Sequence, residues 1–302
     1  MTSRQAQHGA TTLPSPLVSA QWLADHLGAD DLVVVDASVV SYTQPNGKPG
    51  SLSGHEQYIA DGHVPGAVFA DLIEGFSDPD GSYPFTRPGA DRFAAAAGAL
   101  GIGPDSTVIV YDTAVGQWAA RFWWLLRAFG HDAAAVLDGG LTAWTADGRP
   151  VERGHVEPTP AVFDGVERAD VWVDKAYVER VVAGQEEAAL VCSIPPKEFT
   201  GEIPSRDRAG VIPGSRSLPA GRLVDRDART ALPDAELHDL FAPILDAPRI
   251  VTYCNGGIAA AAAALQLVRL GETHVAIYDG SLNEWAADPA APLVTAATGA
   301  LA

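Results

Sequence analysis

The sequence predicts an α/β protein of two tandem domains, each a mainly parallel sheet with helices on both faces. Three observations lead to this prediction: an internal repeat, short apolar runs that alternate with helical segments, and a length of 302 residues. The repeat sets "VIVYDTAVGQWAARFWWLLRAFGHDAAAVLDGGLTAW" (108 to 144) against "IVTYCNGGIAAAAAALQLVRLGETHVAIYDGSLNEW" (250 to 285). Earlier segments match as well, with "GHVPGAVFADL" (62 to 72) against "GVIPGSRSLPA" (210 to 220).

The individual elements follow from the apolar runs, which are typical of strands buried on both faces. We expect strands at 32–36, 107–111 and 134–137 in the first copy, and at 188–192, 249–253 and 274–278 in the second. A helix follows the middle strand of each set and ends at Gly130 or Gly271. The polar segment 151–170 is expected to be the linker. We therefore predict a flexible tail over 1–16, a first domain over 17–150 and a second domain over 171–302.

Composition and charge exclude several classes of partner. The net charge is −18, with 38 acidic against 20 basic residues, which argues against nucleic acid or an anionic membrane as a partner. No stretch of about 20 apolar residues predicts a membrane helix, and the start of the chain does not resemble a secretory signal, so we expect a cytoplasmic protein. The two cysteines lack the spacing of a disulfide framework or a zinc site.

One of these cysteines, Cys254, lies where a parallel α/β sheet binds its ligands, at the carboxyl end of a strand and before a helix that begins near Ala259. Loop amides and the positive end of that helix favour a thiolate. We expect Gly256 and Gly257 to adopt positive φ and to bring the amides close to the sulfur. The first copy has Asp112 at this position, and packing alone does not exchange a thiol for a carboxylate. We therefore predict that Cys254 is a catalytic nucleophile.

The ordered segments "SAQWLADHL", "GHVPGAVFADL", "RFWWLLRAFGH", "VLDGGLTAW", "IPGSRSLP" and "YDGSLNEW" resemble the tandem-domain rhodaneses, which include thiosulfate and 3-mercaptopyruvate sulfurtransferases. The resemblance runs from about residue 17 to the end of the repeat. It implies a catalytically silent first domain, with Asp112 in place of the Cys, and a catalytic second domain. There Cys254 would take a sulfane sulfur from a small donor, form a persulfide and pass the sulfur to a thiol, cyanide or protein acceptor.

The resemblance also implies a substrate site made of loop amides and no metal or organic cofactor, and the net charge predicts no nucleic-acid or membrane partner. The loop residues expected to bind substrate through their backbone amides are Asn255, Gly256, Gly257, Ile258, Ala259 and Ala260.

The loop departs from the family pattern because "CNGGIA" has neither the basic residues of thiosulfate-type members nor the serine of mercaptopyruvate-type members. The donor therefore stays open between thiosulfate, 3-mercaptopyruvate and a related compound. Two family arginines are replaced by Ile194 and Glu198. Arg206 and Arg208 are candidates to bind the donor instead, the alternative being solvated loop charges. Cys192 is a candidate resolving thiol, the alternative being buried filler.

Two other functions remain as alternatives. A sulfur-relay or regulatory protein could carry a persulfide with little turnover on small donors. A Cys-dependent phosphatase or arsenate reductase needs an Arg six residues after the Cys, where this chain has Ala260. Outside the loop, we predict that Asp138 and Asp279 form local turns.

Overall fold

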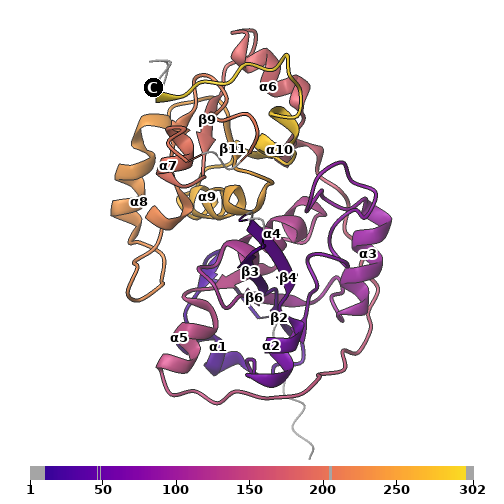
Figure 1. The fold of residues 1–302 in the computed structure, drawn as a ribbon. Coiled ribbons are helices and arrows are strands. Elements are labelled where there is room, and N and C mark those ends of the chain that lie inside the picture. Colours follow the sequence, from indigo (N-terminus) through magenta and orange to yellow (C-terminus); the bar gives the residue numbers. More distant parts are fainter. Residues whose placement is uncertain (1–10, 46, 48, 204–205, 297–302) are drawn as a thin grey trace, which may run out of the picture.

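The computed structural model describes residues 11–45, 47, 49–203 and 206–296 and contains two five-stranded sheets (Figure 1). The first sheet has the order β1 (Leu17–Val18), β7 (Ala134–Leu137), β6 (Thr107–Tyr111), β2 (Leu32–Asp36), β5 (Val68–Phe69). The second has the order β10 (Arg216–Ser217), β9 (Ala189–Cys192), β11 (Ile250–Tyr253), β12 (Val275–Tyr278), β8 (Trp172–Val173). All pairs within these two sheets are parallel, and the second order read backwards matches the first strand by strand. This confirms the predicted duplication of a parallel α/β fold.

The six expected strands lie within one residue of their predicted bounds, whereas one antiparallel hairpin was not predicted. This hairpin pairs β3 (Val39–Thr43) with β4 (Pro49–Ser53) in the first domain. Five of its ten residues are exposed and only Val39 is buried, so it lacks the apolar pattern that identified the six expected strands. The short helix α7 (Pro196–Phe199) occupies the corresponding part of the second copy.

The helices surround both sheets. In the first domain they are α1 (Ala20–His26), α2 (His55–Ala60), α3 (Ala90–Ala99), α4 (Gln117–Ala128) and α5 (Gly140–Ala146). In the second they are α6 (Lys175–Val182), α7, α8 (Asp234–Phe241), α9 (Ile258–Arg269) and α10 (Ser281–Trp285), with 3₁₀ turns at Ala169–Val171, Ala220–Arg222 and Ala242–Ile244. Two of these helices, α1 and α6, have side-chain N-caps, because the side chains of Ser19 and Asp174 accept hydrogen bonds from amides of their first turns.

The first sheet is buried on both faces, as predicted. Alternate residues such as Val34 and Ile109 belong to one apolar cluster, while Val35 and Val110 belong to a second cluster that continues into the other domain. Helices α4 and α9 pack against each other at the centre of that shared core (Figure 1). The two α/β units therefore meet along the helices that follow Asp112 and Cys254.

The segment between the units has no regular helix or strand from 153 to 168, and it binds to the first domain along its path. The amide of Ala161 donates to the carbonyl of Gly98 over 2.8 Å, and the amide of Arg168 donates to that of Ala128 over 2.7 Å. Within the residues that the structure describes, no helix is long and apolar enough to span a membrane.

Candidate active site

Cys254 lies at the carboxyl edge of the second sheet, immediately after β11, with 3% of its surface exposed. Gly257 caps the amino end of α9 with φ +80°, as predicted from its sequence position. Gly256 does not adopt positive φ, so that expectation was wrong. It packs closely against its neighbours instead, because a Cβ there would lie 2.9 Å from the Asn283 side-chain nitrogen, which would have to shift.

The first domain shows what such a loop can hold, because its amides surround the buried carboxylate of Asp112. One carboxylate oxygen accepts hydrogen bonds from the amides of Ala114 and Gly116, over 2.9 and 3.0 Å. The other accepts from Trp118 and Ala119, over 2.9 and 3.1 Å. Burial raises the pKa of Asp112, and these four hydrogen bonds act in the opposite direction. The cradle therefore holds the Asp112 carboxyl group through four backbone amides.

The second loop has the same frame. Gly116 and Gly257 cap α4 and α9 with φ of +82° and +80°. The carbonyl oxygens of Asp112 and Cys254 accept hydrogen bonds from Leu141 and Leu282, over 3.2 and 3.1 Å. The first loop is one residue longer between the nucleophile position and the capping glycine. Two loops of matching construction thus hold a carboxylate in one domain and a thiol in the other.

A cavity of about 580 Å³ opens beside Cys254 between the two domains. The second domain contributes Ser193, Ile194, Pro195, Glu198, Arg206, Cys254, Asn255, Gly256, Ile258, Ala259 and Asn283 to its wall. The first contributes Gln44, Pro49, Gly50, Ser51, Ile73, Pro84, Phe85, Gln117 and Trp118, three of them from the hairpin strand β4. The first domain therefore forms much of the cavity wall, which the sequence did not indicate.

One cation and one anion lie on either side of Asn255 in this cavity. The Arg206 guanidinium donates to the Asn255 side-chain oxygen, and the Asn255 amide nitrogen donates to the Glu198 carboxylate over 3.3 Å. Burial lowers the pKa of Arg206, and the nearby Glu198 carboxylate opposes that shift. Arg208 does not line the cavity and instead binds the main-chain carbonyls of Asp288 and Ala291. Of the two candidate arginines, the structure brings only Arg206 to Cys254.

Cys192 is fully buried in β9, next to Tyr253 of β11. Burial raises the pKa of the Cys192 thiol to about 12, so it is protonated near neutral pH. Both cysteines are free thiols. Because a resolving cysteine must react as the thiolate, this environment favours the reading of Cys192 as buried filler. Among the described residues, no three His, Cys, Asp or Glu side chains are placed to hold a metal ion.

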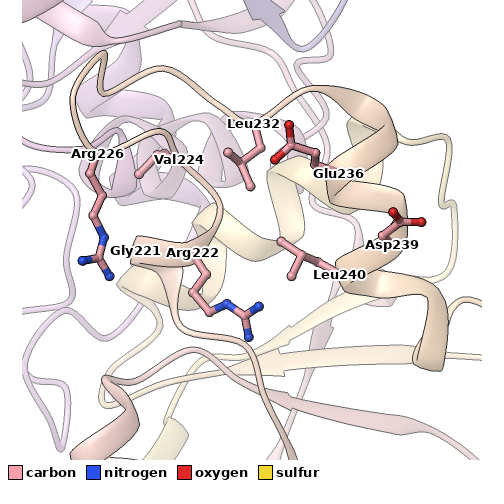
Figure 2. A pocket seen from close by; sticks show the side chains of 8 residues that line it. All are labelled: Gly221, Arg222, Val224, Arg226, Leu232, Glu236, Asp239 and Leu240. Carbon is pink, nitrogen blue, oxygen red and sulfur yellow. The ribbon is translucent and has the colours of Figure 1, made fainter.

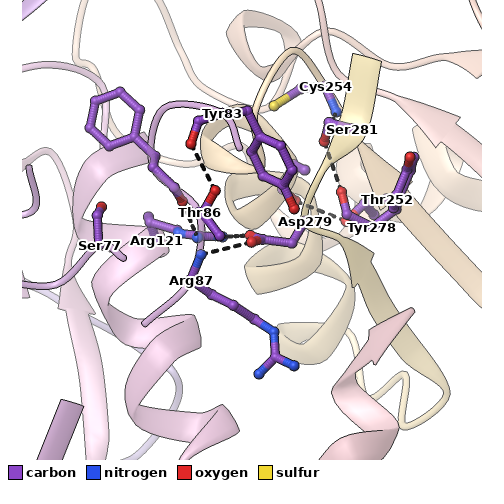
Figure 3. Close-up of polar contacts among 12 residues, drawn as sticks. Ser77, Tyr83, Thr86, Arg87, Arg121, Thr252, Cys254, Tyr278, Asp279 and Ser281 are labelled. Carbon is purple, nitrogen blue, oxygen red and sulfur yellow. Dashed lines mark hydrogen bonds and ion pairs between the residues drawn. The ribbon is translucent and has the colours of Figure 1, made fainter. Parts of the chain in front are cut away.

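Asp138 and Asp279 join the domains, so the prediction that they form local turns missed their principal partners. Asp279 accepts a hydrogen bond from the amide of Arg87 over 2.8 Å and pairs with the Arg121 guanidinium at 2.6 Å (Figure 3). Asp138 accepts from the amide of Ala231 over 2.7 Å. Each carboxylate thus binds the main chain of the other domain, which a local Asp-Gly pattern does not reveal.

Another pocket, of about 450 Å³, lies beside α8, away from both cysteines (Figure 2). It is lined by Gly221, Arg222, Val224, Arg226, Leu232, Glu236, Asp239 and Leu240. None of the residues predicted to bind substrate is among them.

The duplicated parallel fold has a buried thiol at the carboxyl edge of one sheet and a cavity between the two domains, which defines a two-domain α/β protein with a candidate cysteine site. The family model described as "Rhodanese-like domain" matches residues 19–147 and 185–288. The chain belongs to the rhodanese family.

Curated relatives of both donor types match at nearly the same level. The 3-mercaptopyruvate sulfurtransferase of Escherichia coli K12 is 34% identical over 277 residues, which are 89% of this chain and 94% of the relative. The thiosulfate sulfurtransferase of Bos taurus is 35% identical over 283 residues, which are 89% of this chain and 91% of the relative. This chain is therefore a rhodanese-type sulfurtransferase, and the identities do not separate the two donors.

Solved structures agree with this assignment of the fold. The crystal structure of SseA from Escherichia coli, described among the 3-mercaptopyruvate sulfotransferases, matches with a TM-score of 0.78 at 31% identity. The match covers 88% of this chain and 98% of that one. An anaerobic ergothioneine biosynthesis enzyme from Chlorobium limicola has the same fold at 23% identity, with a TM-score of 0.79 over 93% of this chain and 70% of that one.

Proposed function

We propose that this sulfurtransferase carries sulfur as a persulfide on Cys254. In the first step the Cys254 thiolate attacks the sulfane sulfur of a small donor. An S–S bond forms to Cys254, the bond between that sulfur and the rest of the donor breaks, and the donor remnant leaves with the electron pair. In the second step an acceptor thiolate or cyanide attacks the outer sulfur, takes it, and releases the Cys254 thiolate.

The observation that carries this proposal is the cradle around Asp112. Four backbone amides hold that carboxyl group. A loop of the same frame surrounds Cys254, so the amides of residues 255 to 260 are suited to stabilise a thiolate and the terminal sulfur of a persulfide. The thiol also faces a cavity large enough for a small donor.

The charges of the cavity favour a donor with a single negative charge. Arg206 can bind one carboxylate, while the carboxylate of Glu198, held close by through Asn255, repels a second negative charge. We therefore expect 3-mercaptopyruvate or a related monoanion to be a better donor than the thiosulfate dianion. The acceptor and the cytoplasmic location stay predictions from the sequence.

Intact-mass measurement tests the proposal directly. The purified protein is exposed briefly to 3-mercaptopyruvate or thiosulfate, together with the variants Cys254→Ser and Cys192→Ala. We expect a gain of one sulfur atom that requires Cys254, is retained in Cys192→Ala and is faster with 3-mercaptopyruvate. A gain that persists in Cys254→Ser would refute the assignment of the nucleophile.

The variant Glu198→Gln tests the donor preference. Removing the carboxylate is expected to raise kcat/KM for thiosulfate while changing kcat/KM for 3-mercaptopyruvate much less. Equal effects on both donors would contradict discrimination by charge. Loading without measurable turnover on either donor would instead favour the sulfur-relay alternative.

A further inference from the structure

Ser281 has a backbone conformation that residues other than glycine rarely adopt. Its φ is +50°, and it is fully buried at the start of α10. Left-handed φ is unfavourable for a residue with a Cβ and persists only where the surroundings impose it. The position comes two residues after Asp279, which joins the domains, and it lies next to Cys254 (Figure 3).

The repeat shows that glycine suits this position. Gly140 is the counterpart in the first domain and has φ +54°, close to that of Ser281. A Cβ on Gly140 would lie 2.2 Å from the Asp112 carbonyl oxygen, so the silent domain has no room for a side chain there. The second domain has serine at the matching position, although glycine would adopt this backbone conformation without strain.

The hydroxyl of Ser281 accounts for this choice. Its Oγ accepts a hydrogen bond from the Cys254 amide over 3.1 Å and donates one to the Tyr278 carbonyl over 2.8 Å (Figure 3). Leu282, the next residue, donates its amide to the Cys254 carbonyl over 3.1 Å. The amide and the carbonyl of the nucleophile are therefore both fixed by adjacent residues of one segment.

We propose that Ser281 is a positioning residue for Cys254. Its hydroxyl holds the peptide from which the anion-binding loop starts, and this hydrogen bond maintains the strained backbone. The kinetic consequence for sulfur loading rests on the proposed persulfide function, whereas the consequence for thiol reactivity does not.

Two substitutions separate positioning from backbone stability. Ser281→Ala removes the hydroxyl and keeps the strain, whereas Ser281→Gly removes both. Each is made beside Cys192→Ala, so that Cys254 is the single thiol. Urea unfolding, the rate of sulfur loading from 3-mercaptopyruvate, and the pH profile of Cys254 alkylation by iodoacetamide are then measured.

We expect sulfur loading to fall about three- to tenfold in both variants, the worth of one hydrogen bond, although Ser281→Gly relieves the backbone strain and is therefore more stable than Ser281→Ala. Alkylation of Cys254 is expected to slow in both, because the peptide that carries the nucleophile is then less well held. A Ser281→Gly variant with the parent's alkylation profile would overturn the proposal. If the parent loads no sulfur, the persulfide function fails, and the alkylation profiles still decide the role of Ser281.

Discussion

Substitution of Gly257 by alanine should place a methyl group against the ion pair that joins the domains. A Cβ at this position would lie 2.9 Å from the Arg121 guanidinium and 3.0 Å from the Asp279 carboxylate. Both groups are buried and paired at 2.6 Å, so neither can move without weakening that pair. Breaking a buried ion pair costs about 3–5 kcal/mol, and the left-handed backbone adds about 1–2 kcal/mol for alanine. We expect a loss of at least about 3 kcal/mol in the free energy of unfolding.

The chain provides a matched control for this prediction. Gly116 also caps a helix, with φ +82°, and a Cβ there would meet nothing within 4 Å. Gly116→Ala should therefore lose only the backbone contribution, about 1–2 kcal/mol. Urea unfolding followed by tryptophan fluorescence compares the two variants. Equal losses in Gly116→Ala and Gly257→Ala would refute the reasoning, since they would show that the interdomain ion pair adjusts at no cost.

Three further predictions concern Asp279, Asp36 and Cys192. Asp279→Asn should destabilise the protein by about 3–5 kcal/mol, because it leaves Arg121 buried without its charged partner. The control Asp132→Asn, at an exposed pair with Arg168, should cost about 0–1 kcal/mol. Similar losses of unfolding free energy in the two variants would contradict this prediction. Burial raises the pKa of Asp36 from 3.8 to about 6, so the folded state binds this proton more tightly than the unfolded state. The resulting stability is fully present below the unfolded pKa of 3.8 and is lost as the pH rises through the folded pKa of about 6. Asp36→Asn should thus exceed the wild type in unfolding free energy at alkaline pH by as much as about 3 kcal/mol, and a gap that does not narrow in acid would argue against it. Cys192→Ala should leave kcat/KM unchanged, and a large fall would restore a role for this buried thiol in turnover.

The sequence predicted the elements that depend on local patterns. Strands buried on both faces read as apolar runs, and the repeat located Cys254 by its contrast with Asp112. Contacts that depend on the path of the chain in space could not be predicted from local sequence patterns. Arg206 and Arg208 are two residues apart, yet only Arg206 reaches the cavity. The partners of Asp279 lie 158 and 192 residues away along the chain.

At the domain interface, each domain extends a loop of unusual backbone conformation to the other domain. Phe85 and Arg229 both have positive φ, of 62° and 58°, and each lies two residues before an amide that binds the opposite domain's carboxylate. Each domain therefore extends an equivalent strained loop to the carboxylate, Asp279 or Asp138, that follows β12 or β7 in the other domain. The loop that the first domain extends also supplies Phe85 to the cavity beside Cys254. A variant lacking the first domain would thus lose part of the substrate site as well as the buried partners of Asp279.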